Sequence, residues 1–337
     1  MKTFSASLAL LAAGLVALRA EPPTNYYATA EGKAGNELRQ ALHAIIRAHN
    51  VIPYSSSTKI DTRDALEVLD QDPANTNYVI LIYSGSNALA STFGLSTGWN
   101  REHQWPNSYG IDDVQPAYSD LNNLRACDAT VNSSRGNKYF DISDTNSASY
   151  TKPAHVEAPL CSTDSDSWEP PAFQKGDIAR AMFYMATRYT GDATNEPTLI
   201  LTDTVALIAS TNAYMGRLST LLTWHNADPV DAAEEFRNDR VYMLYQTNRN
   251  PFVDHPEWVN LTFAPAYTNA PLLQISTVAN GVTLSWLATN QSAHLECSTN
   301  LPTNWSPVTA TPMLTNNQFR VLWTNGTSRG WFRLKIQ

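Results

Sequence analysis

The chain has few cysteines, which limits both its metal sites and its covalent cross-links. Its 337 residues include only three, Cys127, Cys161 and Cys297, and no two of them form a C-x-x-C pair. This pattern argues against a zinc–thiolate site and allows at most one disulfide. We favour a bond between Cys127 and Cys161, because both fall in the larger predicted domain.

Basic residues are scarce as well. Lys and Arg number 23 against 31 Asp and Glu, and the net charge is −8. Because the first 20 residues carry +2 and residues 265–337 carry +3, residues 21–264 carry −13. No cluster of Lys or Arg is visible along the chain. A protein that binds nucleic acid tightly normally presents a basic face, so composition by itself does not favour such a partner.

Long apolar runs are also missing, except for one near the start. Residues 8–18 are apolar, a basic Lys2 precedes them, and the small Ala20 follows. The run is shorter than the ~20 residues that a membrane-spanning helix needs. It therefore predicts a signal peptide at residues 1–20 that is removed on export, with no membrane anchor.

The rest of the chain is long enough for two domains. Residues 21–264 have mixed helical and strand patterns, and a proline-punctuated linker at residues 265–271 leads to residues 272–337. In that last part, Asn280-Gly281 between two apolar runs predicts a hairpin. We predict an α+β domain followed by a small all-β sandwich.

Apolar spacing predicts several elements of the larger domain. Residues 35–49 and 177–189 each have one apolar helical face, and residues 78–83 form an apolar run typical of a buried strand. Asp228-Pro229 predicts the start of another helix, because an N-cap is followed by a proline at the first helical position.

The densest chemistry lies at residues 99–110, where Glu102 and His103 are adjacent. A carboxylate can bind a hard cation, and a histidine can accept a proton near neutral pH. About 30 residues later, the segment VNSSRGNK adds Asn132 and Arg135. Metal-assisted phosphodiester hydrolysis needs a base, a Lewis acid and a cation near the developing negative charge. These four residues are of the types that fill those roles.

In these segments the sequence resembles the bacterial endonuclease I family, extracellular and periplasmic nucleases with a ββα-metal (His-Me) finger. The resemblance runs through roughly residues 35–258, and its blocks are N-R-E-H-x-W-P at residues 100–106, D-L-x-N-L-R at 120–125, V-N-x-x-R-G-N at 131–137, K-G-D-I-A-R at 175–180 and Q-T-N-R-N-P-F-V-D-H-P at 246–256. It implies a secreted endonuclease with little sequence specificity that acts on DNA, with RNA left open, and it implies no protein partner. It also implies that His103 is the general base and that Glu102 and Asn132 bind Mg²⁺, with Mn²⁺ as a substitute and Ca²⁺ as an inert occupant.

Two departures from the family's pattern limit what carries over. Family members often have histidine where Asn122 stands. Some carry a transition-state arginine on a cysteine-bearing insertion that this chain is too short to contain, and Arg135 is our stand-in for it. We also predict that three residues contact the substrate: Asn137, Asn248 and Asn250. For the last two, capping a helix is an equal alternative.

The placement of Glu102 and His103 side by side poses a geometric problem. Adjacent residues of a regular strand point to opposite faces, so the strand must end or twist at this pair. Trp105-Pro106 close behind fits such an end, because proline cannot donate to a strand ladder.

Helical geometry makes a separate prediction about Arg237. On a helix that starts at Pro229, this residue falls in the middle of an apolar face, so its charge needs a partner. We favour an intrahelical pair with Glu234. The alternative is that Arg237 orients Glu102 or Asp120.

The competing hypothesis is a catalytically silent secreted protein that binds a surface or nucleic acid. Residues 272–337 resemble a β-sandwich appended to many secreted bacterial proteins, which implies attachment or sorting. The acidic charge favours this hypothesis, and the intact Glu102, His103 and Asn132 oppose it.

Overall fold

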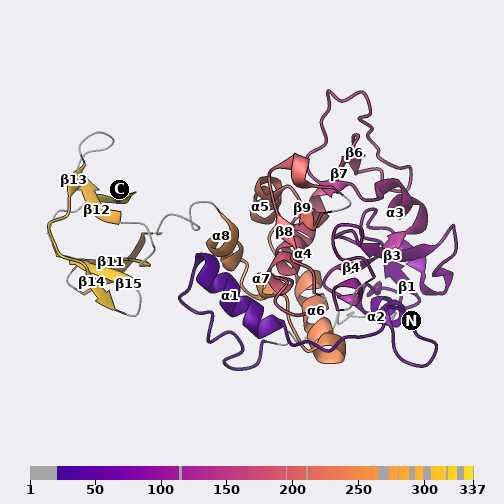
Figure 1. The fold of residues 1–337 in the computed structure, drawn as a ribbon, viewed down its shortest axis with the longest axis horizontal. Helices are drawn as coiled ribbons and strands as arrows, with labels where there is room; N and C mark the ends of the chain where they lie inside the picture. The colour runs from indigo at the N-terminus through magenta and orange to yellow at the C-terminus, as the bar shows by residue number, and fades with distance from the viewer. Residues whose placement is uncertain are drawn as a thin grey trace, which may run out of the picture.

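A computed structural model gives the fold of most of the chain and confirms the α+β class (Figure 1). The predicted signal peptide and linker lie outside the described residues. Those described are residues 21–113, 116–194, 196–209, 212–264, 273–279, 281–287, 293–298, 305–315, 318–324 and 330–336.

Short strands and mostly short helices make up residues 21–264. The α-helices are α1 (Gly35–Ile46), α2 (Thr62–Leu69), α3 (Ala129–Arg135), α4 (Lys175–Arg188), α5 (Leu218–Ala227), α6 (Ala232–Arg240), α7 (Pro251–Asp254) and α8 (Glu257–Phe263). A π-helical segment, η5 (Val241–Gln246), continues α6. The strands are β1 (Tyr78–Ile80), β2 (Asn87–Leu89), β3 (Trp99–His103), β4 (Leu124–Asp128), β5 (Tyr139–Phe140), β6 (Ser162–Thr163), β7 (Ser167–Glu169), β8 (Ile200–Leu201) and β9 (Tyr214–Met215).

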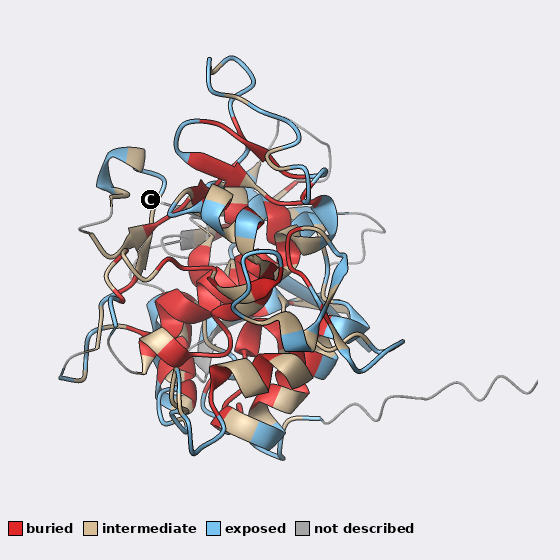
Figure 2. Ribbon diagram, turned by 90° about the vertical axis from the view of Figure 1, so that its right-hand side faces the viewer, coloured by how far each residue is buried: buried red, intermediate tan, exposed pale blue. Residues whose placement is uncertain are grey.

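Helix α4 lies in the core of this part of the molecule. Twelve of its fourteen residues are buried, and residues of α1, α5 and α8 belong to the same apolar cluster, which lies within the red interior of Figure 2. The sequence predicted a single apolar face here. The structure buries the whole circumference, including Arg180 and Arg188, because other elements surround the helix.

The helix predicted to start at Pro229 begins later. Its N-cap is Asp231, whose carboxylate accepts two backbone N–H groups of the first turn of α6 at 2.9 Å each. The carboxylate of Asp228 accepts instead from the backbone N–H of Gly176 at 2.8 Å. This contact with α4 is tertiary, so local sequence signals did not reveal it.

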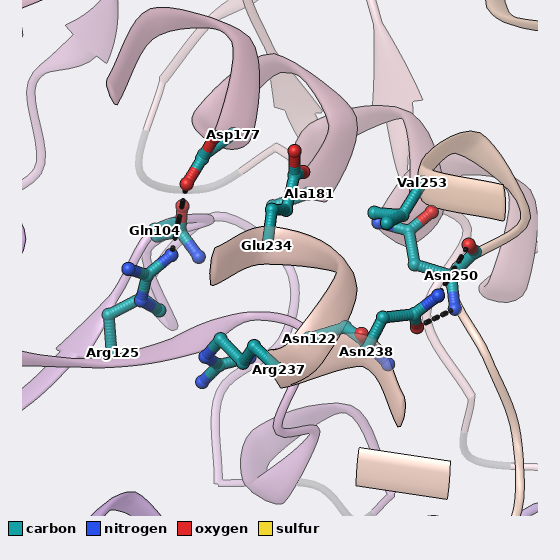
Figure 3. A pocket seen from close by; sticks show the side chains of 10 residues that line it. All are labelled: Gln104, Asn122, Arg125, Asp177, Ala181, Glu234, Arg237, Asn238, Asn250 and Val253. Atoms are coloured by element: carbon teal, nitrogen blue, oxygen red, sulfur yellow. Dashed lines mark hydrogen bonds and ion pairs between the residues drawn. The ribbon is translucent and has the colours of Figure 1, made fainter. Parts of the chain in front are cut away.

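Arg237 is buried, as predicted, but it pairs with none of the three carboxylates that we named for it. Its Nε donates to Asp70 at 2.8 Å, and its terminal nitrogens donate to the carbonyls of Leu121 and Leu124 at 2.9 and 2.7 Å. Glu234 pairs instead with Arg180 of α4, at 2.6 Å. Glu234 and Arg237 both line a pocket of about 30 Å³ (Figure 3).

The predicted disulfide is also wrong, because all three cysteines are free thiols. Cys127 and Cys161 are both buried in the core of the larger part. The Cys161 thiol donates to the carbonyl of Tyr83 at 3.5 Å, so it acts as a packed core residue.

The described residues beyond 272 form two sheets. The strands are β10 (Gln274–Val278), β11 (Gly281–Leu287), β12 (Ala293–Ser298), β13 (Ser306–Pro307), β14 (Met313–Thr315), β15 (Gln318–Trp323) and β16 (Trp331–Ile336). The sheet orders are β10-β11-β15-β14 and β13-β12-β16. Buried residues of both sheets share one apolar cluster, in which Leu284 and Leu295 belong to different sheets. The predicted hairpin is present, with Val278 opposite Gly281.

Nowhere in the described ranges is there a helix both long enough and apolar enough to cross a membrane.

Candidate active site

A β–β–α unit brings the predicted site residues together. Strand β3 pairs antiparallel with β4, and Glu102 lies opposite Arg125. Asp128 ends β4 and caps α3, accepting from the backbone N–H groups of Thr130 and Val131 at 2.8 and 3.0 Å. Because this cap starts α3 at the end of β4, the helix returns against both strands. Residues about 30 positions apart in the chain therefore meet on one unit.

Glu102 and His103 occupy opposite faces of β3, as strand geometry requires. Glu102 is buried against Arg135 of α3. His103 lies on the other face, where its ring packs beside the rings of Tyr54 and Tyr118, which also contact each other. The strand ends at this pair: beyond it, the backbone N–H of Trp105 donates to the side chain of Asn123 at 2.7 Å, in place of a ladder bond.

The surroundings of His103 fix its tautomer. Nε2 lies 2.9 Å from the backbone carbonyl of Tyr118. A carbonyl can only accept, so Nε2 carries the proton, and in the neutral ring Nδ1 keeps its lone pair. The rings of Tyr54 and Tyr118 stack with the imidazole at centroid distances of 5.5 and 4.9 Å.

Burial lowers the pKa of His103 to about 4. The carbonyl of Tyr118 opposes this shift, and the charges of Arg101 and Arg135 add to it. The imidazole is therefore neutral at neutral pH, with a lone pair on Nδ1 that can accept a proton.

Two oxygen atoms near α3 have no protein partner among the described residues. Both hydrogen bonds to Glu102 fall on Oε1, from the Tyr83 hydroxyl at 2.5 Å and from Arg135 at 3.0 Å, which leaves Oε2 free. The amide nitrogen of Asn132 donates to Asn100 Oδ1 at 2.7 Å and to the Arg101 carbonyl at 3.0 Å, which leaves Oδ1 free. Carboxylate and amide oxygens are the donors that Mg²⁺, Mn²⁺ and Ca²⁺ prefer.

A metal site built from several His, Cys, Asp or Glu side chains has no support in the described ranges. No group of three or more His, Cys, Asp or Glu that could hold a metal is found there.

Burial raises the pKa of Glu102, while the charge of Arg135 and the hydroxyl of Tyr83 act in the opposite direction. A cation beside Oε2 would likewise favour the charged carboxylate. The oxygen pair therefore fits a hard cation that keeps several of its waters.

Arg135 is placed to support β3. The residue is 1% exposed, and its Nη1 donates to Glu102 and to the His103 carbonyl at 3.0 Å each. Nη2 donates to the Gln104 carbonyl at 2.8 Å, and the guanidinium lies 4.6 Å from the ring centre of Phe140. This placement favours a positioning role over direct contact with a phosphate.

The three asparagines predicted to contact substrate differ in their placement. Asn137 is exposed just after α3. The Nδ2 of Asn248 donates to the Ile46 carbonyl and the Tyr184 hydroxyl at 3.0 and 2.8 Å, and the residue is buried. Asn250 is buried too and caps the start of α7, so the capping alternative describes it. For Asn248 and Asn250 these contacts favour a structural role.

Several residues that shape the site had no assigned role in the sequence analysis. Tyr54 and Tyr118 pack together beside the His103 ring, and the Tyr83 hydroxyl donates to Glu102. Asn123 stood inside a motif block, and its side chain exchanges two hydrogen bonds with the backbone of Trp105. Only Asn123 carried a usable signal, since the tyrosines reach the site through tertiary packing.

Comparisons with known proteins show the family of this chain. The family model described as Endonuclease I matches residues 34–257. An extracellular ribonuclease of Bacillus amyloliquefaciens is 44% identical over 237 residues, which cover 70% of this chain and 76% of the relative. An extracellular ribonuclease of Bacillus subtilis (strain 168) is 42% identical, with coverage of 70% and 77%. The match extends over most of the larger part, including β3, β4 and α3, and the chain belongs to the endonuclease I family.

Proposed function

We propose that this chain is a secreted, metal-dependent endonuclease, with His103 as its general base and Mg²⁺ held by Glu102 and Asn132. Its family and its relatives support an enzyme that hydrolyses phosphodiester bonds. The observation that carries the residue assignment is the set of free atoms on one β–β–α unit: Oε2 of Glu102, Oδ1 of Asn132 and Nδ1 of His103.

The two free oxygens would hold the metal. When bound there, Mg²⁺ would act as a Lewis acid that offsets negative charge on the scissile phosphate. Asn132 is held for this role because its amide nitrogen donates to two acceptors of β3, which leaves Oδ1 available to a metal. Arg135 keeps Glu102 in place through Oε1.

His103 would then take the proton from the attacking water. As the water oxygen forms a bond to phosphorus, Nδ1 accepts its proton, and the bond from phosphorus to the leaving oxygen breaks. The carbonyl of Tyr118 helps to stabilise the imidazolium that results, because it accepts from Nε2. Tyr54 and Tyr118 keep the ring from rotating away.

RNA is the substrate that we propose to test first. Both relatives are named extracellular ribonucleases, and these names also support secretion. DNA remains in the proposal because the 2′-hydroxyl is recognised by local contacts that the free atoms above do not specify.

An activity gel tests this function. The purified full chain would be incubated with single-stranded RNA, single-stranded DNA and duplex DNA, each with Mg²⁺ and with EDTA. We expect internal cleavage of RNA in Mg²⁺ and none in EDTA. A protein that binds these strands without cutting any of them would instead be the silent binding protein of the competing hypothesis.

A further inference from the structure

Arg101 lies on the same face of β3 as His103. The two residues are separated by one position, and alternate residues of a strand share a face. Both side chains contact the ring of Tyr54: the guanidinium carbon of Arg101 is 3.7 Å from the ring centre, and the imidazole stacks at 5.5 Å. After burial, the charge of Arg101 is the largest of the causes that lower the pKa of His103, in keeping with this proximity.

Neutral groups hold the guanidinium of Arg101. Its Nη1 donates to the carbonyl of Tyr54, to Thr62 Oγ1 at 3.0 Å and to Ser55 Oγ at 3.2 Å. Its Nη2 donates to Ser55 Oγ at 3.2 Å. The ring of Phe93 lies 5.1 Å from the guanidinium. Three acceptors, two in the segment before α2 and one at its first residue, thus fix the guanidinium through Nη1 and one hydrogen of Nη2.

One edge of this guanidinium has no partner among the described residues. The hydrogen bonds use Nη1 and one hydrogen of Nη2, which leaves the Nε–H and the second Nη2–H. Arg101 is half-buried, and its Nε, which has no partner among the described residues, is not one of the buried unpartnered atoms, so the Nε–H side of this edge reaches solvent. Two parallel N–H groups are the arrangement that binds a phosphate with two hydrogen bonds.

Arg101 also differs from the other arginines around the site, each of which faces a carboxylate. Arg135 pairs with Glu102, and Arg237 pairs with Asp70. Arg125 lies between Asp70 and Asp177. Within the described part of the chain no carboxylate forms an ion pair with Arg101, so its charge is not offset by direct contact.

We propose that Arg101 binds a backbone phosphate of the nucleic-acid strand beside the linkage that is cut. The inference rests on the proposed nuclease function, since it takes the His103 end of β3 as the point of cleavage. The preformed, half-buried guanidinium would align the strand so that the next phosphate reaches His103. It supplies the positive contact that a strongly acidic domain otherwise lacks at this end of β3.

The test is the salt dependence of binding. A fluorescent single-stranded oligonucleotide would be titrated with the full chain in EDTA, and anisotropy would be read at several salt concentrations. We compare the wild-type chain with Arg101→Gln and Arg101→Lys. Loss of one phosphate contact should weaken binding about 10-fold or more and reduce the slope of log K against log salt by about 0.7. Arg101→Lys should keep the slope but lose affinity, because it retains the charge without the fork.

Arg63→Gln is the matched control. Arg63 lies against the same Phe93 ring, at 5.3 Å, but pairs with Glu67 at 2.9 Å. We expect its slope to remain that of the wild-type chain. Thermal unfolding of each variant separates a lost contact from a lost fold, and Arg101→Lys decides the case if Arg101→Gln unfolds.

The outcomes separate this inference from the proposed function. If the wild-type chain cuts in Mg²⁺ and Arg101→Gln keeps both affinity and slope, the role of Arg101 is wrong and the nuclease function stands. If Arg101→Lys is folded but its slope is reduced by one phosphate contact, the prediction that a positive charge at this position is enough to keep the contact is wrong. If the wild-type chain cuts no nucleic acid, the proposed function fails whatever the slopes show.

Discussion

Arg135 fixes the end of β3 at three acceptors, and this makes it the most informative single residue to change. Replacing it with methionine, which has similar length and no charge, leaves Glu102 buried without its cation. We expect Arg135→Met to destabilise the fold by about 3–5 kcal/mol and to lower the cleavage rate, because Glu102 and the His103 backbone lose their support. Urea unfolding and initial cleavage rates measure the two effects.

The double variant Arg135→Met, Glu102→Gln serves as the control. With both charges removed, much of the lost stability should return, while activity should stay low because the proposed metal ligand is changed. If Arg135→Met loses activity and keeps the urea midpoint of the wild-type chain, then Arg135 acts on the substrate directly, in the transition-state role that the sequence analysis gave it.

His225 makes the stability depend on pH. Its Nε2 lies 3.0 Å from the Pro256 carbonyl, so Nδ1 is unprotonated and accepts from Arg180 at 3.4 Å. Burial, with the charge of Arg180, lowers its pKa from 6.5 to about 4. Between these values the unfolded chain binds a proton that the folded protein excludes, so stability falls as the pH is lowered through this window.

The expected loss from this histidine is about 2 kcal/mol between pH 7 and pH 4.5. Urea unfolding at the two pH values, for the wild-type chain and for His225→Gln, measures it. The glutamine variant should lose less stability over the same interval. Equal losses in both proteins would show that His225 does not titrate as described.

At the residue scale, the sequence predicted chemical types better than atomic roles. The motif predicts a base at His103 and oxygen donors at Glu102 and Asn132, and the structure places all three residues on one β–β–α unit. The motif could not say that Oε1 of Glu102 is occupied, because its partners come from Tyr83 and Arg135 through packing. The same reason explains why the sequence did not distinguish exposed Asn137 from buried Asn248.

At the element scale, β4 is held in place by a clamp from another helix. Arg237 of α6 donates to two carbonyls around the start of β4 and to Asp70 at the end of α2. The clamp joins α6 and α2 to the strand that supports β3. The buried residues of α6 are all polar, Arg237 among them, although the sequence predicted an apolar inner face for this helix.

We expect Arg237→Met to destabilise the protein by about 3–5 kcal/mol, because two buried carbonyls lose their donor and Asp70 loses the nearer of its two arginines. Arg240 on the same helix is the control: it reaches one carbonyl, that of Val68, and lies 4.0 Å from the Phe236 ring. Arg240→Met should change stability by about 1 kcal/mol or less. Similar urea midpoints for the two variants would contradict the clamp.

Helices whose boundaries depend on local signals were predictable, and those set by tertiary contacts were not. The spacing over residues 35–49 and 177–189 gave α1 and α4 to within a few positions. The start of α6 was misplaced by three residues, because the carboxylate of Asp228 binds α4 and Asp231 provides the cap. The two-residue strands had no periodicity long enough to read.

At the scale of the whole molecule, internal pairing removes many of the few basic side chains from the surface. Many arginines of the larger part are buried in ion pairs, among them Arg180, Arg188 and Arg249. These cations stabilise the fold and are not available to a substrate. Composition therefore describes the packing of this protein more than its partner.

The C-terminal strands should be dispensable for chemistry. Their apolar cluster shares no residue with the clusters of the larger part. A protein ending at residue 264 should melt cooperatively and cut a short soluble oligonucleotide at the rate of the full chain. A folded truncation that has lost turnover would show that the C-terminal strands contribute to the site.

The most direct test of the central claim is the cleavage rate of His103→Ala. With RNA and saturating Mg²⁺, we expect the rate to fall by on the order of 10²–10⁴-fold, because no other group accepts the proton of the attacking water. The circular dichroism spectrum and the melting of the variant should match those of the wild-type chain. His225→Gln, a histidine change away from the β–β–α unit, should keep the wild-type rate. A folded His103→Ala protein that cuts RNA as fast as the wild-type chain would contradict the assignment of the general base.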